Sequence, residues 1–237
     1  MTDKEMRSIL IEYLSIKNRK FRIFQEKSVG SSVCDLMLVT DKLSGFEIKS
    51  DSDNFERINR QIAAYEQFFN ENTLVVGAKY AGIAEKKVPE NWGILCIERQ
   101  KVSVVRLAGN NKKASVKNQL SVLWRIELKN LLLQNDLPAF TYKSKEYIIE
   151  RLAESVPEKT LLEQTVHELL TRDYSLYNEK DFTIRSQEAV HNPGEKELFG
   201  EDLADRLSEE DLTQLTLDKR MEIYQRAMQF AKKRQPC

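Results

Sequence analysis

Two stretches decide how we interpret this chain of 237 residues: Val33-Cys34-Asp35-Leu36-Met37-Leu38-Val39 and Phe46-Glu47-Ile48-Lys49. The first is apolar on both faces except at Asp35, and a lone carboxylate in such a strand is costly unless a cation or hydrogen-bond donors meet it. In the second stretch side chains alternate, so Glu47 and Lys49 share one face. If an odd-numbered loop joins the two strands, odd positions pair with odd positions and Asp35 lies on that same face.

Three such groups on one strand face would suit hydrolysis assisted by a divalent metal ion. Asp35 and Glu47 offer hard carboxylate oxygens, and Mg²⁺ typically takes one or two protein carboxylates and keeps several waters. Lys49 could position or activate a metal-bound water, or stabilise developing negative charge. Glu26, at the end of the preceding predicted strand, is a candidate third carboxylate. Because Glu-x-Lys alone usually marks a solvated strand face, the pattern gains its specificity from Asp35.

The surrounding sequence predicts an α/β domain up to about residue 110. Helical spacing predicts a helix over 3–16, and residues 53–56 are typical of a capping box that opens a second helix. Turn chemistry is expected over 41–45. The second helix carries an apolar stripe formed by Phe55, Ile58, Ile62, Tyr65 and Phe69. Strands are predicted at 21–26, 33–40, 46–50, 73–78, 92–97 and 102–107, which gives an αβββαβ order with a mixed sheet.

Two further residues of the second predicted helix lie close to the strand pair. Gln61 and Tyr65 are four positions apart, so they share a face of the helix. Gln61 lies beside the apolar stripe and is expected to face the strands. For Tyr65 we favour a place in the core over a role in the site, because it belongs to the stripe itself.

The composition changes after residues 109–111, which contain one glycine and two asparagines. We assign residues 1–110 to the α/β domain, 111–172 to a helical region, and 173–237 to a polar loop followed by a C-terminal helix. The expected helices are 115–133, 144–155, one within 157–172, and 208–235. Residues 173–200 lack periodicity and are assigned to a loop or linker.

The last predicted helix presents Met221, Tyr224 and Met228 on one face. Ordinary core packing explains such a face. A surface for a protein partner or for a second copy of the chain also explains it, because the long loop before it weakens its connection to the rest.

Charge and cysteine usage exclude several classes of protein. Lys plus Arg and Asp plus Glu both number 37, so the chain is no histone-like binder, although a local basic groove is compatible with this balance. No run of 18 apolar residues predicts a membrane span, and the charged start is unlike a signal peptide. Three cysteines without a C-x-x-C spacing favour a reducing cytoplasm. Two histidines make zinc sites and His-based triads poor candidates.

Taken together, these residues resemble the PD-(D/E)xK nuclease superfamily, and most closely a bacterial and phage branch similar to the repair-associated MmcB proteins. The resemblance covers about residues 1–100 and implies a restriction-endonuclease-like core. It also implies that Asp35 and Glu47 bind Mg²⁺ or Mn²⁺, that Lys49 is catalytic, and that Glu26 and Gln61 support them. Cys34 stands where the superfamily name has proline, a position that varies widely. The matching features are 30–39, Gly45-Phe46-Glu47-Ile48-Lys49-Ser50-Asp51, Arg57, Gln61, Tyr65, Thr73-Leu74-Val75-Val76-Gly77 and Trp92-Gly93.

A weaker resemblance concerns the helical region. Residues 128–138 and 142–152 resemble a SAP-type helix–loop–helix DNA-binding module. Lys143 and Lys145 at a helix start could meet phosphates, and Arg57 is a third candidate contact to nucleic acid. An ordinary helical hairpin with surface lysines explains the same pattern, and we slightly favour it.

These observations lead to two hypotheses from different classes. The first is a metal-dependent nuclease that hydrolyses DNA phosphodiester bonds, in repair or in phage–host conflict. The second is a catalytically silent nuclease-fold module that binds nucleic acid or inhibits a protein partner. The complete Asp, Glu and Lys set favours the enzyme, whereas the net charge of zero favours the module, because duplex binding gains from phosphate neutralisation.

Overall fold

The structure is a computed structural model, which describes residues 1–172 and 197–199. The predicted C-terminal helix and most of the predicted loop before it lie outside the described residues, so the partner surface of Met221, Tyr224 and Met228 stays a prediction. Within the described residues, none of the helices combines the length and the apolar character needed to cross a membrane.

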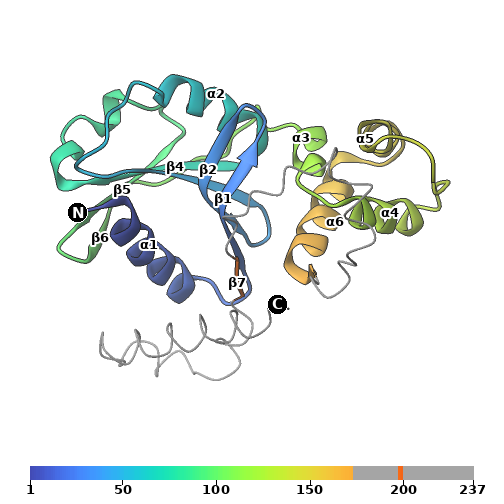
Figure 1. Ribbon diagram of the computed structural model, residues 1–237, viewed down its shortest axis with the longest axis horizontal. Coiled ribbons are helices and arrows are strands. Elements are labelled where there is room, and N and C mark those ends of the chain that lie inside the picture. The colour runs from blue at the N-terminus through green and yellow to red at the C-terminus, as the bar shows by residue number, and fades with distance from the viewer. Residues whose placement is uncertain (173–196, 200–237) are drawn as a thin grey trace.

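A seven-stranded mixed sheet forms the centre of the molecule, in the order β6-β5-β4-β3-β2-β1-β7 (Figure 1). β4 pairs in parallel with β3 and β5, and every other neighbouring pair is antiparallel. This arrangement confirms the α/β class and the mixed sheet expected from the sequence. The strands are β1 (Arg22–Val29), β2 (Ser32–Val39), β3 (Leu43–Lys49), β4 (Glu71–Gly77), β5 (Gly93–Glu98), β6 (Lys101–Arg106) and β7 (Glu197–Phe199).

Two helices cover opposite faces of the sheet (Figure 1). α1 (Asp3–Lys17) begins with a capping box between Thr2 and Glu5, which satisfies backbone donors that the first turn leaves unpaired. Its buried stripe packs against one face, and α2 (Ile58–Phe68) packs against the other. The buried residues of α1 are Met6, Leu10, Ile11 and Leu14, at the spacing of one helix face.

The helical region lies beside the β1–β2 hairpin (Figure 1). Its apolar side chains join the same cluster that α2 forms with the sheet. Arg22 of β1 is buried and donates hydrogen bonds of 2.7 Å to the carbonyl oxygens of Leu169 and Arg172, so the sheet holds the end of the last helix among the described residues. The helices are α3 (Val116–Ser121), α4 (Arg125–Gln134), α5 (Lys145–Ser155) and α6 (Glu158–Thr171), and two short 3₁₀ turns, η1 (Ala78–Tyr80) and η2 (Ala84–Lys86), follow β4.

Two helix boundaries differ from those predicted. The expected helix over 115–133 is two helices, because the backbone N–H of Trp124 donates to the carboxylate of Glu127, which opens α4 as a new helix. The expected capping box over 53–56 is also wrong. Asp53 accepts hydrogen bonds from the N–H and the hydroxyl of Ser50 and shapes the loop, while α2 begins five residues later.

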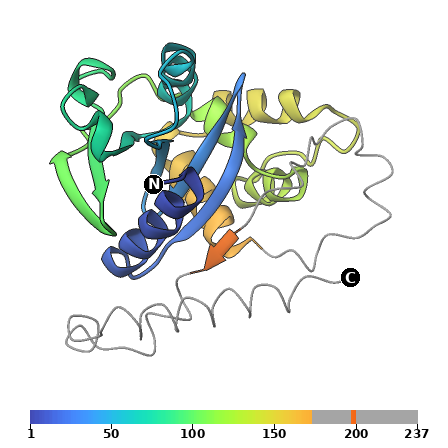
Figure 2. The same ribbon diagram turned by 60° about the vertical axis from the view of Figure 1, so that its left-hand side comes forward.

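Several strand boundaries differ as well. β1 continues to Val29, so Glu26 lies within this strand and not at its end, and β4 begins two residues before the predicted start at Thr73. The turn expected over 41–45 is shorter, because β3 already begins at Leu43 and pairs there with β2. Within the expected loop 173–200, residues Glu197–Phe199 form β7, which pairs with β1 (Figure 2). A strand of three residues has no periodicity that a sequence pattern could reveal.

Candidate active site at the divergence of two strands

β2 and β3 separate at the position of Asp35. Their last paired positions are Leu36 and Phe46, and the register joins odd positions to odd positions, which confirms the expected parity. Beyond this pair the Asp35 side chain replaces the backbone ladder, because its Oδ2 accepts a hydrogen bond of 2.7 Å from the N–H of Ile48. The parity sets Asp35 across from Glu47, at the point where the strands diverge.

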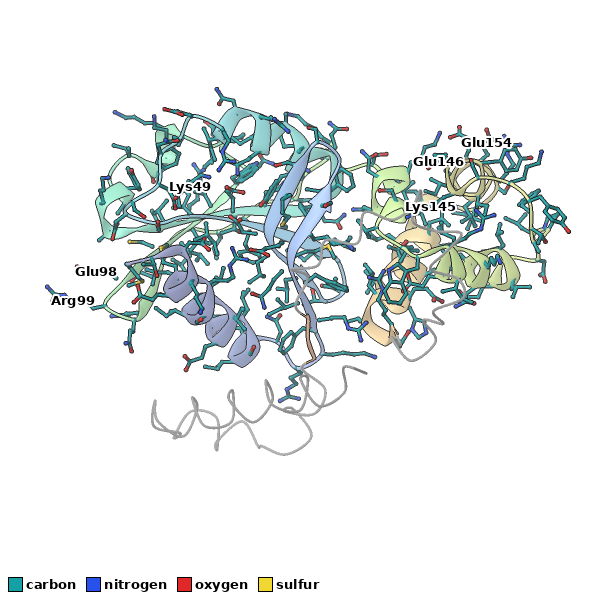
Figure 3. The ribbon with its side chains drawn as sticks, in the orientation of Figure 1. Lys49, Glu98, Arg99, Lys145, Glu146 and Glu154 are labelled. Carbon is teal, nitrogen blue, oxygen red and sulfur yellow. The ribbon has the colours of Figure 1, made fainter. Side chains whose placement is uncertain are left out.

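Glu47 lies at the centre of a closed group of hydrogen bonds. Its Oε1 accepts from Lys49 Nζ at 2.6 Å and from Gln61 Nε2 at 2.5 Å. Lys49 Nζ also donates to Gln61 Oε1 at 3.0 Å. Glu47 is 1% exposed and Lys49 5% exposed, and Figure 3 shows Lys49 between the sheet and α2. The structure therefore brings together three of the predicted site residues from two elements.

Tyr65 belongs to the site as well as to the core, which corrects the expectation that favoured the core alone. Its ring is fully buried, between Phe69 and Trp92. Its hydroxyl donates to Glu47 Oε2 at 2.7 Å and accepts from the N–H of Asp35 at 3.1 Å. The four-residue spacing from Gln61 is the sequence signal that could have revealed this position.

The ionised form of Asp35 is disfavoured in this site. Burial first, and then the neighbouring Glu47 carboxylate, raise the pKa of Asp35 to about 7. The hydrogen bond from Ile48 and the guanidinium of Arg7 act in the opposite direction without cancelling the rise. A bound cation would favour the ionised form of Asp35 and lower this pKa.

Glu26 lies next to Asp35 but outside the hydrogen-bonded group of Glu47, Lys49 and Gln61. It falls opposite Asp35 in the β1–β2 register, its backbone has a φ of +54°, and its side chain is about half exposed. One partner of Glu26 is Arg7 of α1, whose Nη1 lies 3.3 Å from Glu26 Oε1. The sequence analysis missed Arg7, because nothing in its spacing distinguishes it from other charged residues of an amphipathic helix.

The three candidate contacts to nucleic acid are not gathered at the strand divergence. Arg57 precedes α2 and is exposed, and Lys143 is exposed before α5. Lys145 is partly buried, and its Nζ donates to the carbonyl oxygen of Ser121 at 2.7 Å. Burial, followed by the positive charges around it, lowers the pKa of Lys145 to about 8. Figure 3 shows Lys145 in the helical region and Lys49 beneath α2.

The donor set fits one hard divalent cation with few protein ligands. Asp35 and Glu47 supply carboxylate oxygens, and Mg²⁺ commonly binds through one or two carboxylates, with waters and substrate phosphates completing its shell. In residues 1–172 and 197–199, no group of three or more His, Cys, Asp or Glu side chains is arranged to hold a metal ion. A site here would depend on water and substrate for its remaining ligands.

The family model described as bacteriophage P4 protein cII matches residues 1–198. The chain belongs to the bacteriophage P4 protein cII family. The match includes every residue of the candidate site and all four helices of the helical region.

Two known proteins are similar to this family member. Protein cII of Enterobacteria phage P4 is 27% identical over 212 residues, which cover 86% of this chain and 77% of the phage protein. A solved structure, the SPO1766 protein of unknown function from Silicibacter pomeroyi, matches 47% of this chain and 77% of its own, with 16% identity and a TM-score of 0.38. The name protein cII states no chemistry, so the function is argued from the site.

Proposed function

We propose that this chain is a divalent-cation-dependent nuclease of the PD-(D/E)xK type, related to the MmcB-like branch, which hydrolyses DNA phosphodiester bonds. The order α1-β1-β2-β3-α2-β4 supports a restriction-endonuclease-like core. The observation that carries the proposal is the arrangement at the strand divergence, where Asp35 lies across from Glu47 and Lys49 contacts Glu47 from the same strand.

Each polar group then has a chemical role. Asp35 and Glu47 would hold Mg²⁺ or Mn²⁺, and the bound cation would supply an activated water and balance phosphate charge. Lys49, held by Glu47 and Gln61, offers an ammonium that can stabilise the negative charge developing on the phosphate. Glu26 remains a supporting carboxylate beside Asp35.

Contacts to DNA outside the site are part of the proposal. Arg57 and Lys143 are exposed and can reach phosphates. Lys145 would have to give up its hydrogen bond to Ser121 to contact a phosphate, so we assign it a smaller contribution to DNA binding. The buried thiol of Cys34 and the partly buried thiol of Cys96 are both unpaired, which supports a reducing compartment such as the cytoplasm.

A second candidate function is a nuclease-fold module without catalysis, which binds nucleic acid or a protein partner. One observation favours it: both oxygens of Glu47 already accept hydrogen bonds, from Lys49, Gln61 and Tyr65. A carboxylate satisfied in this way needs no metal to be stable in a buried position.

A cleavage assay separates the two functions. Labelled single-stranded, duplex and branched DNA, with RNA of the same sequence, are incubated with the full chain in Mg²⁺ or Mn²⁺ and in EDTA. Cleavage that requires the cation and disappears in Glu47→Gln supports the nuclease. The matched control is Glu98→Gln, at the exposed turn between β5 and β6 (Figure 3), which should cleave like wild type. Absence of cleavage on every substrate, with binding retained, would favour the module.

A further inference from the structure

One partly buried cation of the site has no role in the mechanism so far. Arg7 lies in the first half of α1 and its side chain is 13% exposed. Its guanidinium contacts carboxylates from three elements: Asp3 at 2.8 Å, Glu26 at 3.3 Å and Asp35 at 3.9 Å. Arg7 Nη1 also donates to the carbonyl oxygen of Asp35 at 3.4 Å.

The position of Arg7 relates it to the metal-binding carboxylates. α1 and α2 cover opposite faces of the sheet, so Arg7 reaches Asp35 from one side while Tyr65 of α2 reaches it from the other. Asp35 therefore stands between the Glu47 group and the Arg7 group. The positive charge of Arg7 lies 3.9 Å from Asp35. In a partly buried site, one unit charge at this distance has a large electrostatic effect.

The formal charges around the strand divergence show what Arg7 contributes. Lys49 contacts Glu47 on the α2 side of the sheet, while Arg7 contacts Asp3, Glu26 and Asp35 from the α1 side. Arg7 thus places a positive charge beside the Asp35 carboxylate, and this charge would repel a cation bound there.

We propose that Arg7 is the built-in counter-cation of this site, which balances Asp35 and Glu26 from the α1 side and thereby limits how tightly the site holds a divalent cation. This inference rests on the proposed function, because it assumes that Asp35 and Glu47 bind the metal. Arg7 is a positioning residue: it holds two carboxylates and sets how strongly the site attracts the ion.

The proposal predicts an unusual direction of change. Loss of a merely structural contact weakens metal binding, because the ligands become less ordered. Loss of a counter-cation strengthens it, because a repelling charge near the ion disappears. For Arg7→Gln we expect Mn²⁺ to bind about tenfold more tightly, the scale of one unit charge acting on a divalent ion over several ångströms of partly solvated protein.

The experiment titrates the full chain with Mn²⁺ alone and follows free Mn²⁺ by electron paramagnetic resonance. Wild type should bind one ion per chain. Arg7→Gln should bind with about tenfold higher affinity, while Arg7→Lys, which keeps the charge and guards against misfolding of the glutamine variant, should stay within about twofold of wild type. Arg99→Gln is the control, since Arg99 is 93% exposed at the β5–β6 turn (Figure 3).

The outcomes separate this inference from the proposed function. An unchanged or weaker affinity in Arg7→Gln would overturn the role of Arg7 and leave the metal site standing. Glu47→Gln should lose the binding. If wild type does not bind Mn²⁺, both the proposed metal site and the inference about Arg7 are wrong.

Discussion

Replacing Asp35 with asparagine should stabilise the cation-free protein. A pKa of about 7 for Asp35, against an ordinary value of 3.8, corresponds to roughly 4 kcal/mol of unfavourable free energy when the group is ionised. The asparagine carbonyl can still accept the hydrogen bond from Ile48. This pKa already includes the attraction of Arg7. Because the amide nitrogen of asparagine needs an acceptor that the carboxyl group did not, we expect a net gain of only about 2 kcal/mol in the free energy of unfolding.

The pH dependence follows from the direction of the pKa. Because folding raises the pKa of Asp35, its ionisation destabilises the folded state, and stability is lost as the pH rises from about 4 through about 7. In EDTA at pH 8, Asp35→Asn should therefore melt about 4–8 °C above wild type, and at pH 5 the difference should shrink to less than half. With saturating Mg²⁺ the difference in melting temperature should shrink or change sign, because only wild type gains stability by binding the cation.

Scanning calorimetry at the two pH values measures both effects. Asp41→Asn is the matched control, since Asp41 is exposed in the turn between β2 and β3 and should show no such pH dependence. If wild type is more stable than Asp35→Asn in EDTA at pH 8, the view that ionised Asp35 beside Glu47 destabilises the cation-free protein is refuted.

Further substitutions test the packing around the site. Tyr65→Phe removes the hydroxyl that Glu47 and the Asp35 backbone share, and should cost about 1–3 kcal/mol in the free energy of unfolding, measured by urea denaturation, and weaken the Mg²⁺-induced rise in melting temperature. Gly45→Ala places a Cβ 2.3 Å from the ring of Phe69, and calorimetry should show a loss of about 1–3 kcal/mol. Arg22→Met leaves two carbonyl oxygens of the helical region without their donor, so hydrogen exchange should quicken at the end of α6.

The β2–β3 hairpin was predictable because its information is local. An odd-numbered loop and alternating side chains fix the parity, and the parity places Asp35 across from Glu47. Lys49 followed from the same alternation. Gln61 required only the spacing of one helix, whose stripe was clear in the sequence.

The contacts that the sequence did not reveal depend on how separate elements pack. Arg7 reaches Asp35 because α1 crosses the face of the sheet opposite α2, and no spacing within α1 records that crossing. Tyr65 looked like a core residue, and it is one, but the hydroxyl at its end is placed by the divergence of two strands. The capping box predicted at Asp53 was wrong for a similar reason. The Asp53 carboxylate accepts a hydrogen bond from Ser50 in the loop and does not cap a helix N-terminus.

Single-turnover cleavage under saturating Mn²⁺ tests the central claim most directly. The comparison is between wild type, Lys49→Ala and the control Lys101→Ala, whose lysine is exposed on β6. Lys49 lies 2.6 Å from Glu47 and is no metal ligand, so Lys49→Ala should keep metal binding and lose about a hundredfold or more in rate. Lys101→Ala should cleave like wild type. Equal rates in wild type and Lys49→Ala, or no cleavage by wild type on any nucleic acid, would contradict a nuclease site built on Asp35, Glu47 and Lys49.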